Sequence, residues 1–255
     1  MLIITYNVNG LRAAIGKGFM EWLEAASPDV LCIQETKMQD GQLSPGYFEA
    51  LGYNMLHHFA EKKGYSGVAL LVKKEPDRYF FGMGIEKYDR EGRVIRADYA
   101  DFTLINAYVP SGTQGGIRQE FKMEFLSGFH SYILELMKTR SKVIVSGDFN
   151  ICHKPIDINH PERHKKSSGF LPEEREWVDG FINSGFIDAF REFNREPGQY
   201  SWWSYRANSR QKNLGWRIDY HMVSQSSRER LKRATILQEV NHSDHCPVLV
   251  EIDIP

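Results

Sequence analysis

Short apolar runs recur along the chain, with turn residues such as glycine, proline and asparagine between them. Their length and their content of β-branched residues predict β-strands. The predicted strands are Leu2 to Tyr6, Val30 to Ile33, Val68 to Val72, Phe102 to Tyr108, Val143 to Val145, Ile218 to Val223 and Val248 to Ile252.

Longer segments between several of these strands carry the signals of helices. Phe19 to Ala26 is closed by Pro28, and Pro172 to Ser184 opens with a proline and two acidic residues. In Arg118 to Lys138, apolar residues recur at helical spacing. Strands with intervening helices predict an α/β protein.

Polar residues at the ends of the predicted strands refine this arrangement. They close Tyr6-Asn7-Val8-Asn9, Ile33-Gln34-Glu35, Asn106-Ala107-Tyr108 and Ser146-Gly147-Asp148-Phe149-Asn150, and they open Arg217-Ile218-Asp219 and Ser243-Asp244-His245. If all of these residues share one site, some strands must run towards it and others away from it. That excludes an all-parallel doubly wound sheet and favours mixed or antiparallel sheets with helices outside.

The composition is typical of a soluble, compact protein. Of the 255 residues, 42% are hydrophobic and 25% are charged, and no linker, low-complexity tract or short repeat interrupts them. We therefore expect residues 1–255 to form a single domain and to act as a monomer. No segment approaches the roughly 20 unbroken apolar residues of a membrane helix, and the N-terminus is typical of a first strand rather than a signal peptide. Three cysteines, Cys32, Cys152 and Cys246, favour reduced thiols and a cytoplasmic location, associated with the nucleoid if the source is bacterial.

The overall charge argues against bulk attraction to a nucleic acid. Lys plus Arg is 32 and Asp plus Glu is 33, so any DNA-binding face must concentrate its cations locally. Arg163 to Lys166 is a compact cationic run, which by itself is most typical of a solvated surface. The stretch from Arg195 to Arg217 is different, because basic and aromatic residues interleave there as in a nucleic-acid groove. It holds Trp202, Trp203, Tyr205, Arg206, Arg210, Lys212 and Trp216.

Asp148 and Asn150 are the first candidates for chemistry. They follow a buried-looking run two residues apart, which puts their side chains on the same side of an extended chain. The carboxylate can take a proton from water, and the amide can hold that water or donate to a phosphoryl oxygen. The alternative is an ordinary Asx turn that ends the strand.

Glu35 is a candidate metal ligand, with a solvated strand end as the alternative. With Asn7 or Asn9 beside it, an oxygen-rich site forms that suits Mg²⁺. A zinc site assembled from His242, His245 and Cys152-His153 is a second possibility. We favour magnesium, because the recurring strand-end groups are carboxylates and carboxamides. His245 also has a potential partner in Asp219, which could fix the orientation of its imidazole.

Eight sequence blocks, in this order, resemble the exonuclease III family of apurinic/apyrimidinic (AP) endonucleases. The resemblance covers nearly the whole chain. The blocks are Thr5-Tyr6-Asn7-Val8-Asn9-Gly10-Leu11-Arg12, Ile33-Gln34-Glu35-Thr36-Lys37, Gly64-Tyr65-Ser66-Gly67-Val68, Asn106-Ala107-Tyr108-Val109-Pro110, Gly147-Asp148-Phe149-Asn150, Ser168-Gly169-Phe170, Gly215-Trp216-Arg217-Ile218-Asp219-Tyr220 and Ser243-Asp244-His245-Cys246-Pro247.

The resemblance implies a four-layer α/β sandwich, in which two packed mixed β-sheets are flanked by helices. It also implies a metal site for Mg²⁺, with Mn²⁺ able to substitute, formed by Asn7, Glu35, Asp148, Asn150, Asp244 and His245. Asp148 would activate the attacking water, Asn150 would place it, and Asp219 would orient His245 against the phosphate. Tyr108 would contact the phosphate or assist the leaving oxygen. Whether Asp148 or His245 is the general base stays open, with the larger share assigned to Asp148.

The same resemblance implies a substrate, double-stranded DNA with abasic sites or blocked 3′ ends. Trp202 and Trp216 would line the pocket for a flipped-out abasic sugar, and Trp203 would be partly structural. Ser111 stands where many relatives have asparagine, and Ser167 stands where some have it, which leaves the specificity of the pocket and the ratio of endonuclease to exonuclease activity open. The matching DNA contacts are Arg12, Lys17, Tyr65, Arg206 and Asn208.

Two other functions compete with a class II AP endonuclease that also has 3′-5′ exonuclease and 3′-end-cleaning activity. One is a metal-dependent phosphoesterase acting on inositol phosphates or phospholipid head groups. The aromatic-basic stretch argues against it. The other is a DNA-binding protein without catalysis, which the complete set of catalytic residues disfavours.

Overall fold

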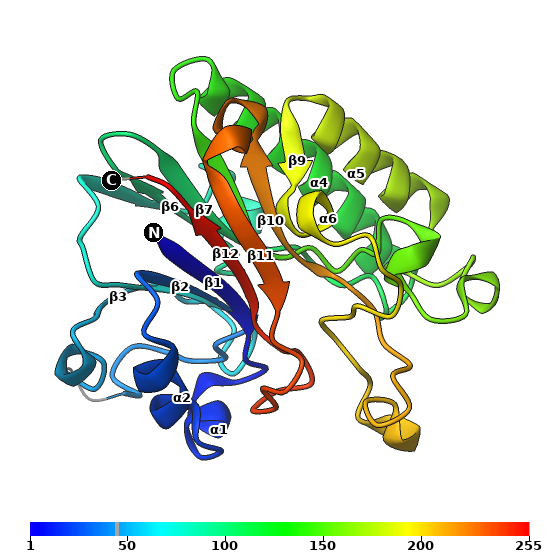
Figure 1. Cartoon of the computed structure of the whole chain (residues 1–255), viewed down its shortest axis with the longest axis horizontal. Helices are drawn as coiled ribbons and strands as arrows, with labels where there is room; N and C mark the ends of the chain where they lie inside the picture. The colour runs from blue at the N-terminus through cyan, green and yellow to red at the C-terminus, as the bar shows by residue number, and fades with distance from the viewer. Residues whose placement is uncertain (44–45, 255) are drawn as a thin grey trace.

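Two six-stranded β-sheets form the centre of the computed structural model, which describes residues 1–43 and 46–254 (Figure 1). The first sheet has the order β11-β12-β1-β2-β4-β3, and the second has the order β5-β6-β7-β8-β10-β9. Strands of the first sheet are β1 (Leu2–Asn7), β2 (Val30–Gln34), β3 (Asn54–His58), β4 (Val68–Val72), β11 (Leu231–Ile236) and β12 (Val248–Ile252). Those of the second are β5 (Arg78–Phe81), β6 (Val94–Asp98), β7 (Thr103–Tyr108), β8 (Val143–Asp148), β9 (Phe186–Asp188) and β10 (Asp219–Ser224).

Helices cover the outer face of each sheet. In Figure 1, α1 and α2 lie on the side of the first sheet, and α4 and α5 lie together on the side of the second. The α-helices are α1 (Leu11–Ile15), α2 (Phe19–Ala26), α3 (Glu86–Asp89), α4 (Gly116–Met137), α5 (Pro172–Asn183) and α6 (Ala189–Phe193). Short 3₁₀-helices are η1 (Glu49–Leu51), η2 (Pro155–Asp157), η3 (Pro161–Arg163), η4 (Arg206–Asn208) and η5 (Gln225–Arg230). No helix of the described ranges is long and apolar enough to cross a membrane.

Three apolar cores separate the four layers. Ile3 and Leu104 belong to the core between the two sheets. Ile4 belongs to the core under α1 and α2, and Phe125 and Phe181 belong to the core under α4 and α5. A strand buried on both faces reads as a continuous apolar run, which is why β1, β2 and β8 were recognisable in the sequence. The predicted four-layer α/β sandwich is confirmed.

Both sheets are mixed, and this brings the strand ends together. β1 is parallel to β2, and β7 is parallel to β8. β12 is antiparallel to β1, and β10 is antiparallel to β8. The carboxyl ends of the parallel pairs therefore lie at the same edge as the amino ends of β10 and β12. The prediction of strands running both towards and away from one site is confirmed.

Polar side chains between the sheets fix one sheet against the other. Gln34 Nε2 donates to Asn106 Oδ1 at 2.7 Å, across the sandwich. Asn106 Nδ2 in turn donates to the carbonyl oxygens of Ile33 and Ala69 at 3.0 and 2.8 Å. Because buried amide groups are costly unless paired, these bonds specify one alignment of the two sheets. That alignment sets which strand ends face each other.

The predicted strands and helices correspond to β1, β2, β4, β7, β8, β10 and β12 and to α2, α4 and α5. The missed α-helices are short, and the missed strands β3, β5, β9 and β11 lie at sheet edges. β6 lies inside the second sheet, but Arg96 interrupts its apolar run. β5 is exposed along its whole length, and β11 presents Lys232 and Arg233 to solvent. β11 therefore has no continuous apolar run, and the short aromatic run of β5, Tyr79 to Phe81, faces solvent instead of a core.

Candidate active site

A pocket of about 810 Å³ lies at the edge where these strand ends meet, and residues of both sheets line it. It contains every predicted catalytic and metal-binding residue except Asp219, which lies directly behind His245. The pocket brings together residues of both sheets, of the loops after β7 and β8 and of the stretch around Trp202. These segments are far apart in the sequence, and the packing of the two sheets and of the loops beside them brings the segments together.

Asp148 and Asn150 are held rigidly at the end of β8. Gly147 is required just before them, because a Cβ there would lie 1.8 Å from the carbonyl oxygen of Ala107 on β7. Asn150 adopts a left-handed conformation with φ of 51°. Its backbone N–H donates to Asp148 Oδ1 at 2.8 Å, and its Nδ2 donates to Asp148 Oδ2 at 3.2 Å. The segment forms an Asx turn and also directs both side chains into the pocket, so the two interpretations of this motif are compatible.

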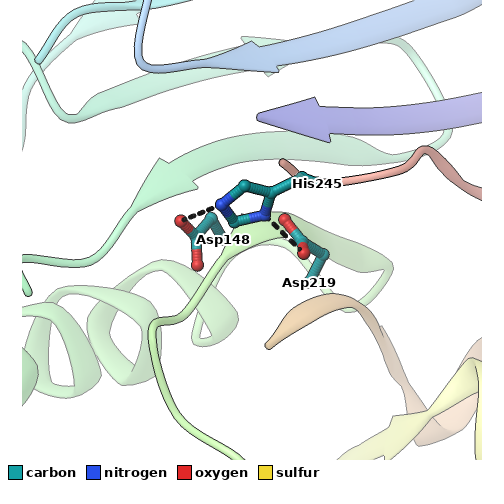
Figure 2. Close-up of side chains that lie close together, drawn as sticks. All are labelled: Asp148, Asp219 and His245. Carbon is teal, nitrogen blue, oxygen red and sulfur yellow. Dashed lines mark hydrogen bonds and ion pairs between the residues drawn. The ribbon is translucent and has the colours of Figure 1, made fainter. Parts of the chain in front are cut away.

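His245 lies between two buried carboxylates (Figure 2). Its Nδ1 is 2.9 Å from Asp219 Oδ2, and its Nε2 is 4.0 Å from Asp148 Oδ2. Burial by itself lowers the pKa of His245, but the charge and hydrogen bond of Asp219 and the charge of Asp148 outweigh it and raise that pKa above its ordinary value. Burial and the neighbouring charge of Asp219 raise the pKa of Asp148. The site therefore holds an imidazolium whose charge faces the pocket.

Asn7 connects the two sheets at the site. Its Nδ2 donates to Asp148 Oδ2 at 2.9 Å and to Glu35 Oε2 at 3.2 Å. Glu35 is in a left-handed conformation, with φ of 57°. Lys37 Nζ lies 3.0 Å from Glu35 Oε1. Non-glycine residues rarely adopt the left-handed conformation. Its occurrence at Glu35, beside the pocket, fits local backbone strain that is kept for function.

Asp244 lies between this group and the tryptophans. Its Oδ1 accepts from Asn9 Nδ2 at 2.9 Å, and its Oδ2 accepts from Trp202 Nε1 at 3.0 Å. Burial raises the pKa of Asp244, but the charge of His245 and these two hydrogen bonds lower it below the ordinary value. Asp244 is therefore an anion at neutral pH.

The donor set fits a divalent cation. Asp148, Asp219 and His245 offer ligand atoms within 4.8 Å of one another. Asp219 Oδ1 is buried and has no hydrogen-bond partner among the described residues. Glu35 adds carboxylate oxygens to the lining of the same pocket, and such oxygens are the ligands that hard cations prefer.

The structure does not bring the residues of the alternative zinc site together. Cys152 is buried, and its Sγ lies 3.3 Å from the carbonyl oxygen of Asp157. His153 Nε2 pairs with Asp179 at 2.8 Å, and His242 contacts the hydroxyl of Tyr6. None of these three predicted zinc ligands lines the pocket. Oxygen donors therefore border the candidate cation site, with the imidazole of His245 beside them.

Tyr108 enters the pocket from the end of β7 and is nearly buried. Burial and the charge of Glu35 raise the pKa of Tyr108 well above its ordinary value, so the phenol keeps its proton. The guanidinium of Arg93 stacks 4.7 Å from the centre of the Tyr108 ring. Sequence reasoning missed Arg93, because it precedes β6 in a segment without a recognisable motif.

The predicted aromatic wall divides between pocket and core. Trp202 and Trp216 line the pocket and meet edge-to-face, with ring centres 5.9 Å apart. Trp203 is buried beneath them, and Arg210 covers its ring at 4.7 Å. The structure thus separates two tryptophans available to a ligand from one that supports the loop.

The predicted DNA contacts lie in different environments. Arg12 on α1, and Arg206 and Asn208 on η4, are exposed. Lys17 Nζ donates to the carbonyl oxygen of His242 at 3.1 Å. Tyr65 is half-buried, and its hydroxyl contacts Glu91, Arg93 and Arg118.

The expectation for the run Arg163 to Lys166 holds in part. Arg163, Lys165 and Lys166 are exposed, as expected of a solvated surface, but His164 is half-buried and lines the pocket together with Lys166. The ring of His164 stands edge-on against Trp216, with the ring centres 5.0 Å apart. The run lies just before Ser168-Gly169-Phe170, one of the family-like blocks, and that adjacency is the signal that could have revealed it.

The fold and the strand-end site define a phosphoesterase built on a four-layer sandwich. Residues 4–245 match the family model described as Endonuclease/Exonuclease/phosphatase family. The chain therefore belongs to the endonuclease/exonuclease/phosphatase family.

Known proteins narrow this class further. The exodeoxyribonuclease of Bacillus subtilis is 41% identical over 256 residues, covering 100% of both chains. The DNA-(apurinic or apyrimidinic site) endonuclease of Dictyostelium discoideum is 40% identical over 260 residues, covering 100% of this chain and 71% of that protein. The structure of the 3′ phosphatase NExo from Neisseria, bound to a product DNA hairpin, superimposes with a TM-score of 0.92 at 28% identity and covers 100% of both chains. The resemblance to exonuclease III-type enzymes and the prediction of a DNA-repair nuclease are confirmed.

Proposed function

We propose that this chain is a class II AP endonuclease, which hydrolyses the phosphodiester 5′ to an abasic site in double-stranded DNA. We include in this function 3′-5′ exonuclease activity and the cleaning of blocked 3′ ends. One observation carries the proposal: a single pocket joins the buried Asp148, His245 and Asp219 group to the two accessible tryptophans. The first part suits hydrolysis of a phosphodiester, and the second suits a nucleotide taken out of the helix.

The reaction follows from the positions of the side chains. Asp148 accepts a proton from water as the water oxygen forms a bond to phosphorus. The bond from phosphorus to the 3′ oxygen breaks, and the phenol of Tyr108 supplies a proton to that oxygen. The products are a 3′ hydroxyl and a 5′ phosphate on the abasic residue. The imidazolium of His245 neutralises charge on a non-bridging phosphate oxygen, which is the electrostatic stabilisation that anionic transition states need.

Glu35 and Asp244 would hold the divalent cation of this site through their carboxylate oxygens, with Asn7, Asp148 and Asn150 beside them. The imidazolium of His245 has no free lone pair for the cation, so it serves the phosphate instead. When bound, Mg²⁺, or Mn²⁺ in its place, supplies further positive charge against the phosphate. Asn7 and Asn150 each hydrogen-bond Asp148, so the carboxylate stays in place whether or not a cation is bound.

The pocket wall accounts for the lesion. A nucleotide without a base loses neither pairing nor most of its stacking when it leaves the helix, so it is the easiest to extrude. Trp202 and Trp216 line the space that the sugar would enter, and Arg12, Lys17 and Arg206 would contact the phosphates around it. In this proposal residues 1–255 act as one catalytic domain and as a monomer. The enzyme works in the cytoplasm, on the nucleoid if the source is bacterial.

A substrate comparison tests the proposal. Matched duplexes with an abasic site, a uracil, a blocked 3′ end or no damage are incubated with the protein and Mg²⁺, alongside phosphoinositides. We expect rapid incision at the abasic site, slower removal of 3′ blocks and no release of phosphate from the lipids. Cleavage of phosphoinositides alone would assign the chain to the phosphoesterase alternative, and binding of abasic DNA without any cleavage would assign it to the non-catalytic one.

A further inference from the structure

Behind the pocket, α4 and α5 are joined by an ion pair that is completely buried. Lys122 Nζ lies 2.6 Å from Glu174 Oε1, and both side chains are 0% exposed. Lysine and glutamate are almost never fully buried unless paired, and withdrawing both charges from water is costly. Neither residue lines the pocket, and the proposed chemistry uses neither.

Glu174 accepts hydrogen bonds from several residues along one side of the pocket. Its Oε2 accepts from the backbone N–H groups of Gly169 and Leu171, at 2.6 and 3.0 Å. Its Oε1 accepts from Gln119 Nε2 at 3.0 Å, and Gln119 Oε1 accepts from Ser168 Oγ at 2.7 Å. All four of these neighbours line the pocket. A single carboxylate therefore positions the loop that follows His164 and one side chain of α4.

Lys122 also connects the Lys122–Glu174 ion pair to the carboxylate of Asp148. Its Nζ donates to the backbone carbonyl oxygen of Asn150 at 2.8 Å. Asn150 is the residue in the left-handed conformation whose N–H and Nδ2 both hydrogen-bond Asp148. The position of Asp148 is thus linked to Glu174 through Lys122 and Asn150.

The pocket walls pack on these residues without spare room. A Cβ on Gly169 would lie 2.8 Å from the ring of Trp216, and a Cβ on Gly112 would lie 1.8 Å from Gln119 Oε1. Packing this tight transmits a displacement instead of absorbing it. Any shift of Glu174 would therefore change the distance between Asp148 and the wall that faces it.

We propose that Lys122 and Glu174 form a positioning pair that sets the width of the pocket relative to Asp148 and so determines which nucleotide reaches the reacting carboxylate. The proposal rests on the proposed AP endonuclease function and deepens it, since it names the residues that select an abasic nucleotide over a normal 3′-terminal one. The pair acts through Asn150, Gln119 and the 168–171 loop and touches no substrate itself.

Two variants and one control test this assignment. Glu174→Gln keeps the size of the side chain and an oxygen for Gly169 and Leu171, but it turns an amide N–H towards Lys122. Lys122→Met combined with Glu174→Gln removes the charge as well. Arg96→Met is the matched control, because it removes the partly buried Arg96–Asp98 ion pair near the end of β6 that lies away from the site. For each folded protein, kcat and KM for abasic incision are measured, together with the rate of 3′-terminal nucleotide removal and the Kd for abasic duplex in chelator.

We expect both pair variants to lose about 10-fold or more in kcat for abasic incision, because a displacement of about 1 Å can cost 10²-fold. The ratio of abasic incision to 3′-terminal removal should change about fivefold, while the Kd stays within about threefold of wild type. Arg96→Met should keep the wild-type ratio. An unchanged ratio in a folded pair variant, or an equal change in the control, would overturn the proposal, and so would failure of both pair variants to fold, which would assign the pair to folding. If wild type itself leaves abasic duplex intact, the proposed function fails instead.

Discussion

Asp219 supports His245 from outside the pocket. Its Oδ2 lies 2.9 Å from His245 Nδ1 and also accepts from Ser201 Oγ at 2.6 Å. Asp219 is fixed further because its own backbone N–H donates to Ser201 Oγ at 3.1 Å. The carboxylate therefore has one orientation, and its effect on the reaction passes through the imidazole.

Asp219→Asn should reduce kcat for abasic incision by about 100-fold or more, with a smaller effect on KM. The substitution keeps the shape of the side chain but removes the charge that sustains the imidazolium of His245. Steady-state kinetics at neutral pH measure the effect. A variant that is folded and fully active would show that the charge of His245 has no part in the reaction.

Asp148→Asn should remove most turnover, by about 10²- to 10⁴-fold, the range for loss of a positioned proton acceptor. Binding of abasic duplex should stay close to that of wild type, because the amide has the size of the carboxylate and keeps the oxygen that accepts from the Asn150 N–H, although the hydrogen bond from Asn7 Nδ2 is lost. Fluorescence anisotropy in chelator measures binding separately from cleavage. Joint loss of binding and turnover would indicate that Asp148 is needed mainly for structure.

Much of this site could be predicted from the sequence because its residues lie at the ends of apolar runs. Asn7, Glu35 and Asp148 each end such a run, and their convergence required only that the strands be mixed in direction. The fold followed from the same runs and from the family-like blocks. The features of the site that the sequence does not predict depend on packing between segments that are distant in the sequence.

Three examples show why the remainder was not predictable. Asn7 lies 141 residues from Asp148, and their hydrogen bond depends on how the two sheets are aligned. Lys122 and Glu174 occur in helical segments where charged residues are usually solvated, so nothing in either helix reveals a buried pair. A short cationic run such as Arg163 to Lys166 predicts surface positions, because it carries no periodicity that marks burial, and so it does not reveal that His164 lines the pocket.

His221 should make the fold sensitive to acid. It is buried between the sheets, with Nε2 2.9 Å from the carbonyl oxygen of Val248 and Nδ1 2.7 Å from Ser146 Oγ. Burial lowers the pKa of His221 to about 4. The folded state therefore binds a proton less readily than the unfolded chain, where the ordinary pKa is about 6.5. Its stabilising contribution is complete above about pH 6.5 and is lost as pH falls towards 4.

Between pH 6.5 and 5, this contribution amounts to about 2 kcal/mol, at about 1.4 kcal/mol for each pH unit. Urea unfolding of wild type and His221→Gln at pH 7, 6 and 5 measures it. The variant is expected to be less stable at pH 7 but to lose less free energy of unfolding on acidification. Parallel pH profiles for the two proteins would contradict the assignment to His221.

Salt should weaken DNA binding steeply, despite a formal net charge of −1, because each phosphate contact releases bound counterions. Arg206→Ala should reduce the slope of log Kd against log salt by about 1 if Arg206 contacts a phosphate. Arg228→Ala is the matched control, since Arg228 lies on η5, beyond the carboxyl end of β10, and pairs with Glu192 on α6. Equal slopes for wild type and Arg206→Ala would remove Arg206 from the proposed DNA-binding face.

The most direct test of hydrolysis by this site is the chemistry of the end that it leaves. A duplex with one abasic site and a 5′ label is incised in Mg²⁺, and the labelled product is offered to a DNA polymerase; a parallel reaction contains excess chelator. Attack of water on phosphorus predicts a 3′ hydroxyl that the polymerase extends directly, and no incision in chelator. A product that cannot be extended, or incision that continues undiminished in chelator, would contradict metal-dependent hydrolysis on the 5′ side of the lesion.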